Sequence, residues 1–195
     1  MLGVQKAERG DSTMTATTAA TYLLYIMGEV FDDLANMKLN KLLYFAQGYY
    51  LKKYGRPLFD NAIEAWEHGP VVPEVYSAYK KYGDKPIKEY DSNMIAEITP
   101  ETEDLIFDVA RQYGRYTIST LQNMACVAGS PWDQVYHGEH SHTEIPLTAI
   151  QSYFAKAEDL APPVKQFKES DFIGYRDENG VLVLPQEWDD GEEGC

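Results

Sequence analysis

Apolar residues recur every three or four positions along most of this chain, a spacing that predicts amphipathic helices. The first predicted helix follows Thr18 or Thr21, because either hydroxyl can serve as its N-cap. The apolar side of this helix is formed by Leu23, Ile26, Met27, Val30 and Leu34.

The second predicted helix, over residues 37–54, has the clearest pattern in the chain, and Gly55 marks its end. Its lysines fall away from its apolar side, so we expect them to face solvent. The apolar positions are Leu39, Leu42, Leu43, Ala46 and Tyr50, and the lysines are Lys38, Lys41, Lys52 and Lys53.

Between residues 56 and 73 the helical period disappears, and several prolines and a glycine interrupt the run. This pattern predicts an irregular connection with a short strand at residues 63–66. Pro73 suits the first turn of a third helix, which we expect to continue to Tyr82 and to end at Gly83.

Three further helices are predicted after a loop. Thr99 and Pro100 supply an N-cap and a first-turn proline, Ser119 begins a capping box, and Pro146 begins the last helix. The predicted fold class is therefore mainly α: a compact single helical domain of about six helices, with a short irregular or β segment near residues 57–72.

The C-terminal region differs in pattern and charge. Asn179-Gly180 lies between two short apolar runs and predicts a C-terminal β-hairpin over residues 171–185. Residues 171–195 carry eight acidic residues against one basic residue, which is half of the chain's net charge of -14. We expect a disordered N-terminus over residues 1–17, a helical domain over 18–160, and an extension with the hairpin and acidic tail over 161–195.

The net charge of -14 argues against direct binding to nucleic acid, because the chain would repel a phosphate backbone. A basic protein partner fits this charge, although acidity can equally serve solubility. The N-terminus lacks the apolar core of a signal peptide, and no apolar run reaches the roughly 20 residues of a membrane span. We therefore expect a cytoplasmic protein that is not bound to a membrane.

Three adjoining motifs carry a family resemblance. KLNKLLYFAQ at residues 38–47 precedes GRPLF at 55–59 and IEAWEHGPVVPEVY at 63–76. In this order they resemble the Panacea domain of SocA-like antitoxins and phage-associated proteins. The likeness continues in outline through Ser130-Pro131-Trp132, but Ala125-Cys126 stands where many relatives carry a Thr-His or Ala-His pair.

This resemblance implies a protein-level antitoxin that neutralises a cognate toxin, encoded by an adjacent gene, through direct binding. SocA-like members look like adaptors that deliver a toxin to a ClpX-type protease, which is the alternative mechanism. Neither mechanism requires a cofactor or catalysis by the antitoxin.

The candidate partner-binding residues lie in the matching block. Its aromatic, imidazole and kinked backbone groups suit a preformed recognition surface. The alternatives are that Trp66 and Val72 fill the core and that the polar residues of the second helix are merely solvated. The candidates are Lys38, Lys41, Tyr44, Gln47, Trp66, Glu67, His68, Pro70, Val71 and Tyr76.

An enzyme is the hypothesis from another class. The sequence has no glycine-rich phosphate loop and no nucleophile elbow, and Cys126 in an apolar setting is typical of an inert thiol. A metal-dependent enzyme would use the histidine-rich loop, although its spacing does not match the helical registers of zinc motifs. The possible ligands there are His137, His140, His142, Glu139 and Glu144.

Overall fold

The computed structural model describes residues 14–28, 34–138, 142–161, 175–176 and 182–183. Contacts divide the chain into two units, residues 1–161 and 162–195, and each is described here by itself. The predicted disordered segment lies outside the described residues as far as residue 13, and its last two residues belong to the first helix.

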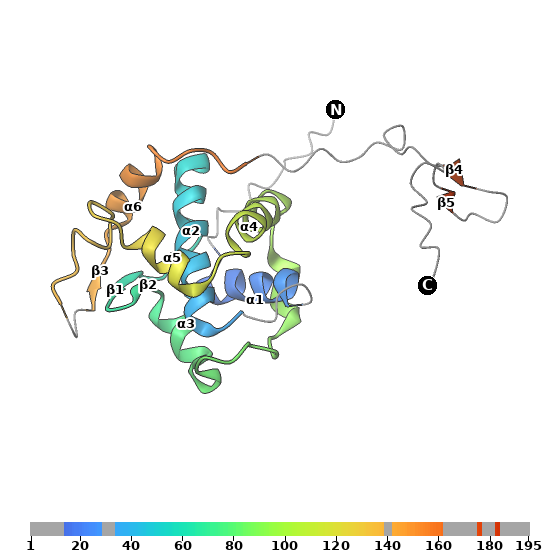
Figure 1. Ribbon diagram of the computed structural model, residues 1–195, viewed down its shortest axis with the longest axis horizontal. Helices are drawn as coiled ribbons and strands as arrows, with labels where there is room; N and C mark the ends of the chain where they lie inside the picture. Colours follow the sequence, from blue (N-terminus) through green and yellow to red (C-terminus); the bar gives the residue numbers. More distant parts are fainter. Residues whose placement is uncertain (1–13, 29–33, 139–141, 162–174, 177–181, 184–195) are drawn as a thin grey trace, which may run out of the picture. The chain divides into compact units, whose positions relative to one another are not determined.

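The first unit is mainly helical, which confirms the predicted fold class. Besides its α-helices, the described part contains two short 3-10 turns, η1 (Lys80–Tyr82) and η2 (Ser92–Glu97). The helices are α1 (Ala16–Met27), α2 (Asn36–Tyr54), α3 (Pro73–Ala78), α4 (Pro100–Tyr113), α5 (Ile118–Ala125) and α6 (Leu147–Phe154) (Figure 1).

Helix α2 occupies the middle of this unit, and α1, α4, α5, α6 and the small sheet all contact it (Figure 1). The crossing with α6 is close, because a Cβ at Gly48 would lie 2.4 Å from the Phe154 ring. The Phe45 ring stacks on Tyr113 of α4 with centroids 4.4 Å apart. A helix packed on all sides is buried around most of its circumference, which explains why little of α2 reaches solvent.

Three short strands form an antiparallel sheet in the order β2-β1-β3. β1 (Glu64–Trp66) and β2 (Gly69–Val71) form a hairpin, within which Ala65 pairs with Pro70. The predicted strand near residues 63–66 is thereby confirmed. β3 (Thr143–Glu144), which pairs with the other edge of β1, has no counterpart in the sequence prediction.

Several helix ends differ from their predicted positions. Thr15, not Thr18 or Thr21, caps α1, because its side chain accepts a hydrogen bond from the Thr18 amide. The first helix also ends before Leu34, which is buried outside it. Helix α5 is capped by Thr117 rather than by Ser119. The two changed starts follow from neighbouring hydroxyls that compete for the same N-cap position.

In the second unit, β4 (Tyr175–Arg176) pairs antiparallel with β5 (Leu182–Val183). This pairing agrees with the predicted hairpin. Its Asn179-Gly180 turn and the acidic tail lie outside the described residues.

Candidate partner-binding site

The polar side chains of α2 point inward and hold the irregular segment that follows the helix. The Gln47 amide donates from Nε2 to the Phe59 carbonyl at 2.9 Å. Its Oε1 accepts from the backbone N–H groups of Leu58 at 2.9 Å and Phe59 at 3.3 Å. Buried backbone groups without a sheet partner need such bonds, so Gln47 does for this loop what a neighbouring strand would do.

Two asparagines, about two and three turns before Gln47 on α2, hold the chain after the hairpin in the same way. Asn40 Oδ1 accepts from the Val72 N–H at 2.8 Å, while its Nδ2 donates to the Asn36 carbonyl at 2.9 Å. Asn36 Nδ2 donates to the Tyr76 carbonyl at 2.9 Å. The start of α3 is therefore tied to α2 by side-chain amides.

Lys41 fixes the hairpin itself, because its buried Nζ donates to the Pro70 carbonyl at 3.0 Å. Burial lowers the pKa of Lys41 to about 7, although the nearby Cys126 thiol opposes the change. Burial also raises the pKa of Cys126 to about 11. Gly69 is required here: its φ is +98°, and a Cβ would lie 3.0 Å from Cys126 Sγ and 3.1 Å from Lys41 Nζ.

Burial corrects the predicted position of the α2 candidates. Lys38, Lys41 and Gln47 are 0% exposed, so the expectation that they face solvent was wrong. Tyr44 is equally buried, its phenol oxygen has no hydrogen-bond partner among the described residues, and burial raises its pKa. The helix pattern misled because it treats every polar residue as solvated, whereas these side chains serve buried backbone or pack inside. Contact of these four with a partner stays a prediction, against which their burial counts.

The six remaining candidates differ in exposure to solvent. Glu67 and His68 are exposed at its tip, and Trp66 and Tyr76 are half-buried. The other two, Pro70 and Val71, are buried in the strand that α2 holds. Of the ten candidates, only Trp66, Glu67, His68 and Tyr76 can therefore touch a partner in this conformation.

Aromatic rings surround this tip. Trp66 meets Tyr76 edge to face with centroids 4.9 Å apart and stacks on His142 at 4.5 Å. Trp132 Nε1 donates to the Trp66 carbonyl at 2.8 Å, and its ring stacks on Tyr136 at 4.4 Å. Trp132 and His142 were not among the predicted site residues, since only folding brings them next to β1.

We name these residues the hairpin face: Trp66, Glu67, His68, Tyr76, Trp132 and His142. The face combines a carboxylate and an imidazole at an exposed tip with half-buried rings, on a backbone held by α2. Such a preformed mixture of aromatic and polar groups is suited to contact with another protein.

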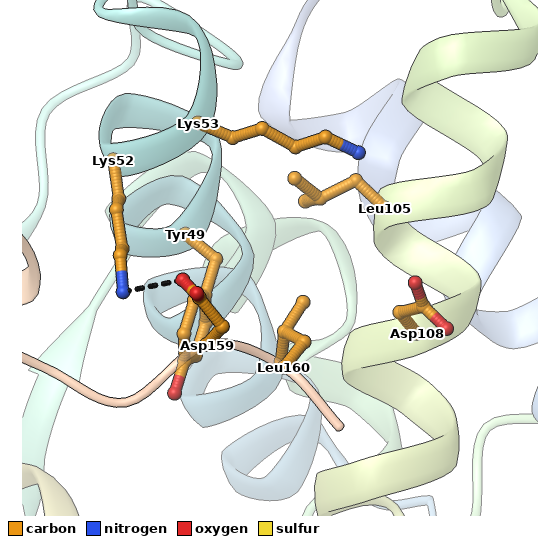
Figure 2. Close-up of a pocket in the computed structure, with 7 residues that line it drawn as sticks. All are labelled: Tyr49, Lys52, Lys53, Leu105, Asp108, Asp159 and Leu160. Carbon is orange, nitrogen blue, oxygen red and sulfur yellow. Dashed lines mark ion pairs between the residues drawn. The ribbon is translucent and has the colours of Figure 1, made fainter. Parts of the chain in front are cut away.

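A hollow of about 300 Å³ lies elsewhere, between α2, α4 and the segment after α6. Figure 2 shows Lys52 and Asp159 facing one another across it, with their charged atoms 2.7 Å apart. Lys52 Nζ also donates to the Ala157 carbonyl at 2.6 Å. These contacts hold the segment after α6 in place, and none of the candidate residues lines the hollow.

No group of three or more His, Cys, Asp or Glu residues that could hold a metal occurs within the described ranges. His142 of the proposed metal loop instead stacks on Trp66. His140 and Glu139, which that hypothesis also needs, lie outside the described residues.

Comparison with known proteins places this site in a family. The model of the "Antitoxin SocA-like, Panacea domain" family matches residues 39–133, and Antitoxin SocA of Caulobacter vibrioides (strain NA1000 / CB15N) is 32% identical over 136 residues. That alignment covers 65% of this chain and 72% of the relative. The chain belongs to the SocA-like Panacea domain family.

The Panacea domain match begins within α2 and includes the β1–β2 hairpin and Trp132, and therefore most of the hairpin face; His142 lies beyond it. No solved structure matches this chain. Among the described helices, none is both long and apolar enough to cross a membrane.

Proposed function

We propose that this protein is an antitoxin that acts in the cytoplasm by binding a cognate toxin directly, without catalysis or a cofactor. Membership of the SocA-like Panacea domain family and the likeness to a protein named Antitoxin SocA support the antitoxin role. The toxin is a protein partner, which we expect to be encoded by an adjacent gene.

The way in which the hairpin face is built supports direct binding of the toxin. Its tip residues Glu67 and His68 stand in solvent, whereas the backbone beneath them is fixed by Lys41 and Asn40. A surface that is already ordered loses little entropy on binding, and half-buried aromatic rings supply apolar contact area. The hairpin face is therefore our candidate for the toxin contact.

Co-expression with the adjacent gene product tests the proposal. The wild-type protein should restore growth and should co-purify with the toxin. The double substitution Glu67→Arg and His68→Glu should abolish rescue and weaken the complex by about 100-fold, as expected for residues in the centre of an interface. Because both side chains are exposed, the unfolding temperature should not change.

Glu158→Arg is the matched control, since Glu158 is exposed on the segment after α6, outside the hairpin face. It should leave rescue and complex formation intact. A toxin that binds the Glu67/His68 double variant as tightly as the wild type would remove the hairpin face from the proposal. A neighbouring product that is neither toxic nor bound would remove the antitoxin role itself.

Toxin half-life separates blocking from delivery to a ClpX-type protease. A blocking antitoxin leaves the toxin's half-life unchanged or extends it, whereas an adaptor shortens it only in cells that contain the protease. Direct neutralisation predicts the first result, in cells with and without the protease.

A further inference from the structure

Two carboxylates lie opposite one another on the small sheet, beside the hairpin face. Glu64 of β1 pairs in register with Glu144 of β3. Side chains at directly opposite positions of an antiparallel pair point to the same side of the sheet, with their Cβ atoms about 5 Å apart. Glu144 is exposed and Glu64 is half-buried, so solvent reaches this side of the sheet. We name Glu64 and Glu144 the carboxylate pair.

An aromatic pair lies next to the carboxylate pair on the same two chain segments. Trp66 follows Glu64 by two positions, so both side chains share one side of the sheet. The Trp66 ring stacks on His142 with centroids 4.5 Å apart, and its Nε1 donates to Glu64 Oε2 at 2.8 Å. This charge-assisted hydrogen bond holds the Glu64 carboxylate beside the rings.

The negative charge of the carboxylate pair is not neutralised within the protein. Among the residues that the structure describes, no lysine, arginine or histidine forms an ion pair with either carboxylate. Like charges directly opposite one another weaken a strand pair, and β3 has only two residues to offset this effect. A cation held between the two carboxylates would remove the repulsion, so this position favours a positively charged ligand.

We infer that the carboxylate pair binds an arginine side chain of the toxin that the hairpin face contacts. A guanidinium is planar and has donors along two edges, so it can bind two neighbouring carboxylates at once, whereas an ammonium is a point charge. Its methylene stem can pack against the adjacent rings. The inference rests on the proposed function for the identity of the partner, but binding of arginine itself can be measured without a toxin.

The test is an NMR titration of the full-length, ¹⁵N-labelled protein with N-acetyl-arginine amide. N-acetyl-citrulline amide has nearly the same shape without the charge, and N-acetyl-lysine amide has the charge without the planar group. The arginine probe should shift the amide signals of residues 64–66 and 142–144, and its affinity should fall with added salt. The lysine probe should bind about threefold more weakly, and the citrulline probe should cause no shifts there.

Substitution of the carboxylates separates this site from a general attraction of cations to an acidic protein. Glu64→Gln with Glu144→Gln should raise the Kd of the arginine probe about tenfold. The unfolding temperature should not fall, because glutamine keeps an acceptor for Trp66 Nε1 and the like charges are gone. Glu101→Gln with Glu158→Gln is the matched control: it removes the same charge at two exposed positions outside the sheet and should leave the Kd unchanged.

Co-expression with the adjacent gene product then tests the site against the toxin. The double variant of the carboxylate pair should bind the toxin about tenfold more weakly and rescue growth less well, whereas the control pair should match the wild type.

Three outcomes of the probe titration would overturn the inference: no shifts at residues 64–66 and 142–144, an equal loss with the control pair, or shifts concentrated in residues 186–195. Unchanged toxin binding by the double variant would overturn it as well. A gene product that the wild-type protein does not bind would instead remove the proposed function, and the probe titration would still decide whether the carboxylate pair binds arginine.

Discussion

Helices α2 and α4 carry polar residues at similar spacing, yet they use them in opposite ways. On α4 the buried positions are almost all apolar, and Glu101 and Asp104 lie in solvent. On α2 the buried positions include Lys38, Lys41 and Gln47. The difference lies in the neighbours: α4 has one side against the core, whereas α2 is packed on every side and adjoins a segment that lacks regular hydrogen bonds. Polar residues on a central helix can thus serve the backbone of another segment.

The sharpest test of this contrast compares two glutamines. Gln47→Ala leaves the N–H groups of Leu58 and Phe59 and the Phe59 carbonyl buried without partners, so it should lower the free energy of unfolding by about 3 kcal/mol or more. Gln112→Ala on α4 removes bonds to the exposed Ala161 amide and to the Tyr113 side chain, leaves no buried backbone group unpaired, and should cost less than about 1 kcal/mol. Urea unfolding of both variants measures the difference, and equal losses would contradict the contrast.

The next largest effect on folding stability is expected from the titration of Lys41. Because its folded pKa of about 7 lies below its ordinary value of 10.5, the unfolded chain binds more protons between these values, and stability rises with pH there. From pH 7 to 9 Lys41 alone adds about 2 kcal/mol. The Cys126 thiol opposes part of this rise, because its raised folded pKa keeps it protonated while the thiol of the unfolded chain begins to ionise.

Lys41→Met should remove that rise, which urea unfolding at pH 7, 8 and 9 would detect. Lys53→Met at the exposed C-terminal end of α2 should retain it. If the Lys41→Met protein keeps the full pH dependence, Lys41 does not titrate as its burial implies.

Close packing around α2 predicts a smaller loss of unfolding free energy. Gly48→Ala would place a methyl group 2.4 Å from the Phe154 ring, so α6 must shift, which should cost about 2 kcal/mol. The same added methyl at Gly55 meets nothing within 4 Å, although its φ of +70° adds strain, so the loss there should be about 1 kcal/mol. Thermal unfolding should rank Gly48→Ala as the more damaging, and the reverse order would contradict close α2–α6 packing.

The smallest change in unfolding free energy is expected for a substitution on the exposed side of α4. Phe107→Ser removes a ring that is 50% exposed, so unfolding free energy should fall by less than about 0.5 kcal/mol. Phe45→Ser, which removes the ring stacked on Tyr113 inside the core, should cost at least about 3 kcal/mol. A large loss for Phe107→Ser in urea unfolding would mean that this exposed ring stabilises the fold.

The helices were predictable wherever local signals and packing agreed. Thr99, Pro100 and the apolar spacing of α4 placed that helix, and its bounds of Pro100–Tyr113 follow them closely. β3 was not predictable, because its two exposed residues gain strand geometry only from pairing with β1. Within the hairpin face, Glu67 and His68 followed from their place between Trp66 and Gly69-Pro70, whereas His142 is distant in sequence and needs the fold.

Prediction failed mainly at the buried lysines and amides of α2, for a reason that applies to other sequences. A helix rich in polar residues precedes a segment broken by Pro57, Gly69 and Pro70, whose N–H and C=O groups must be paired somewhere. The nearby helix is the natural source of those partners. In such a sequence, polar residues on the preceding helix are better interpreted as buried supports than as a solvated side.

The attachment of the β1–β2 hairpin to α2 also limits how its recognition surface can be transplanted. Gln47, Asn40 and Lys41 each complete hydrogen bonds that the hairpin segment cannot make by itself. An isolated peptide spanning residues 57–79 would leave those groups to water and would sample many shapes. Grafting onto a new scaffold therefore requires the central helix as well, so the smallest portable binding element is the helix and hairpin together.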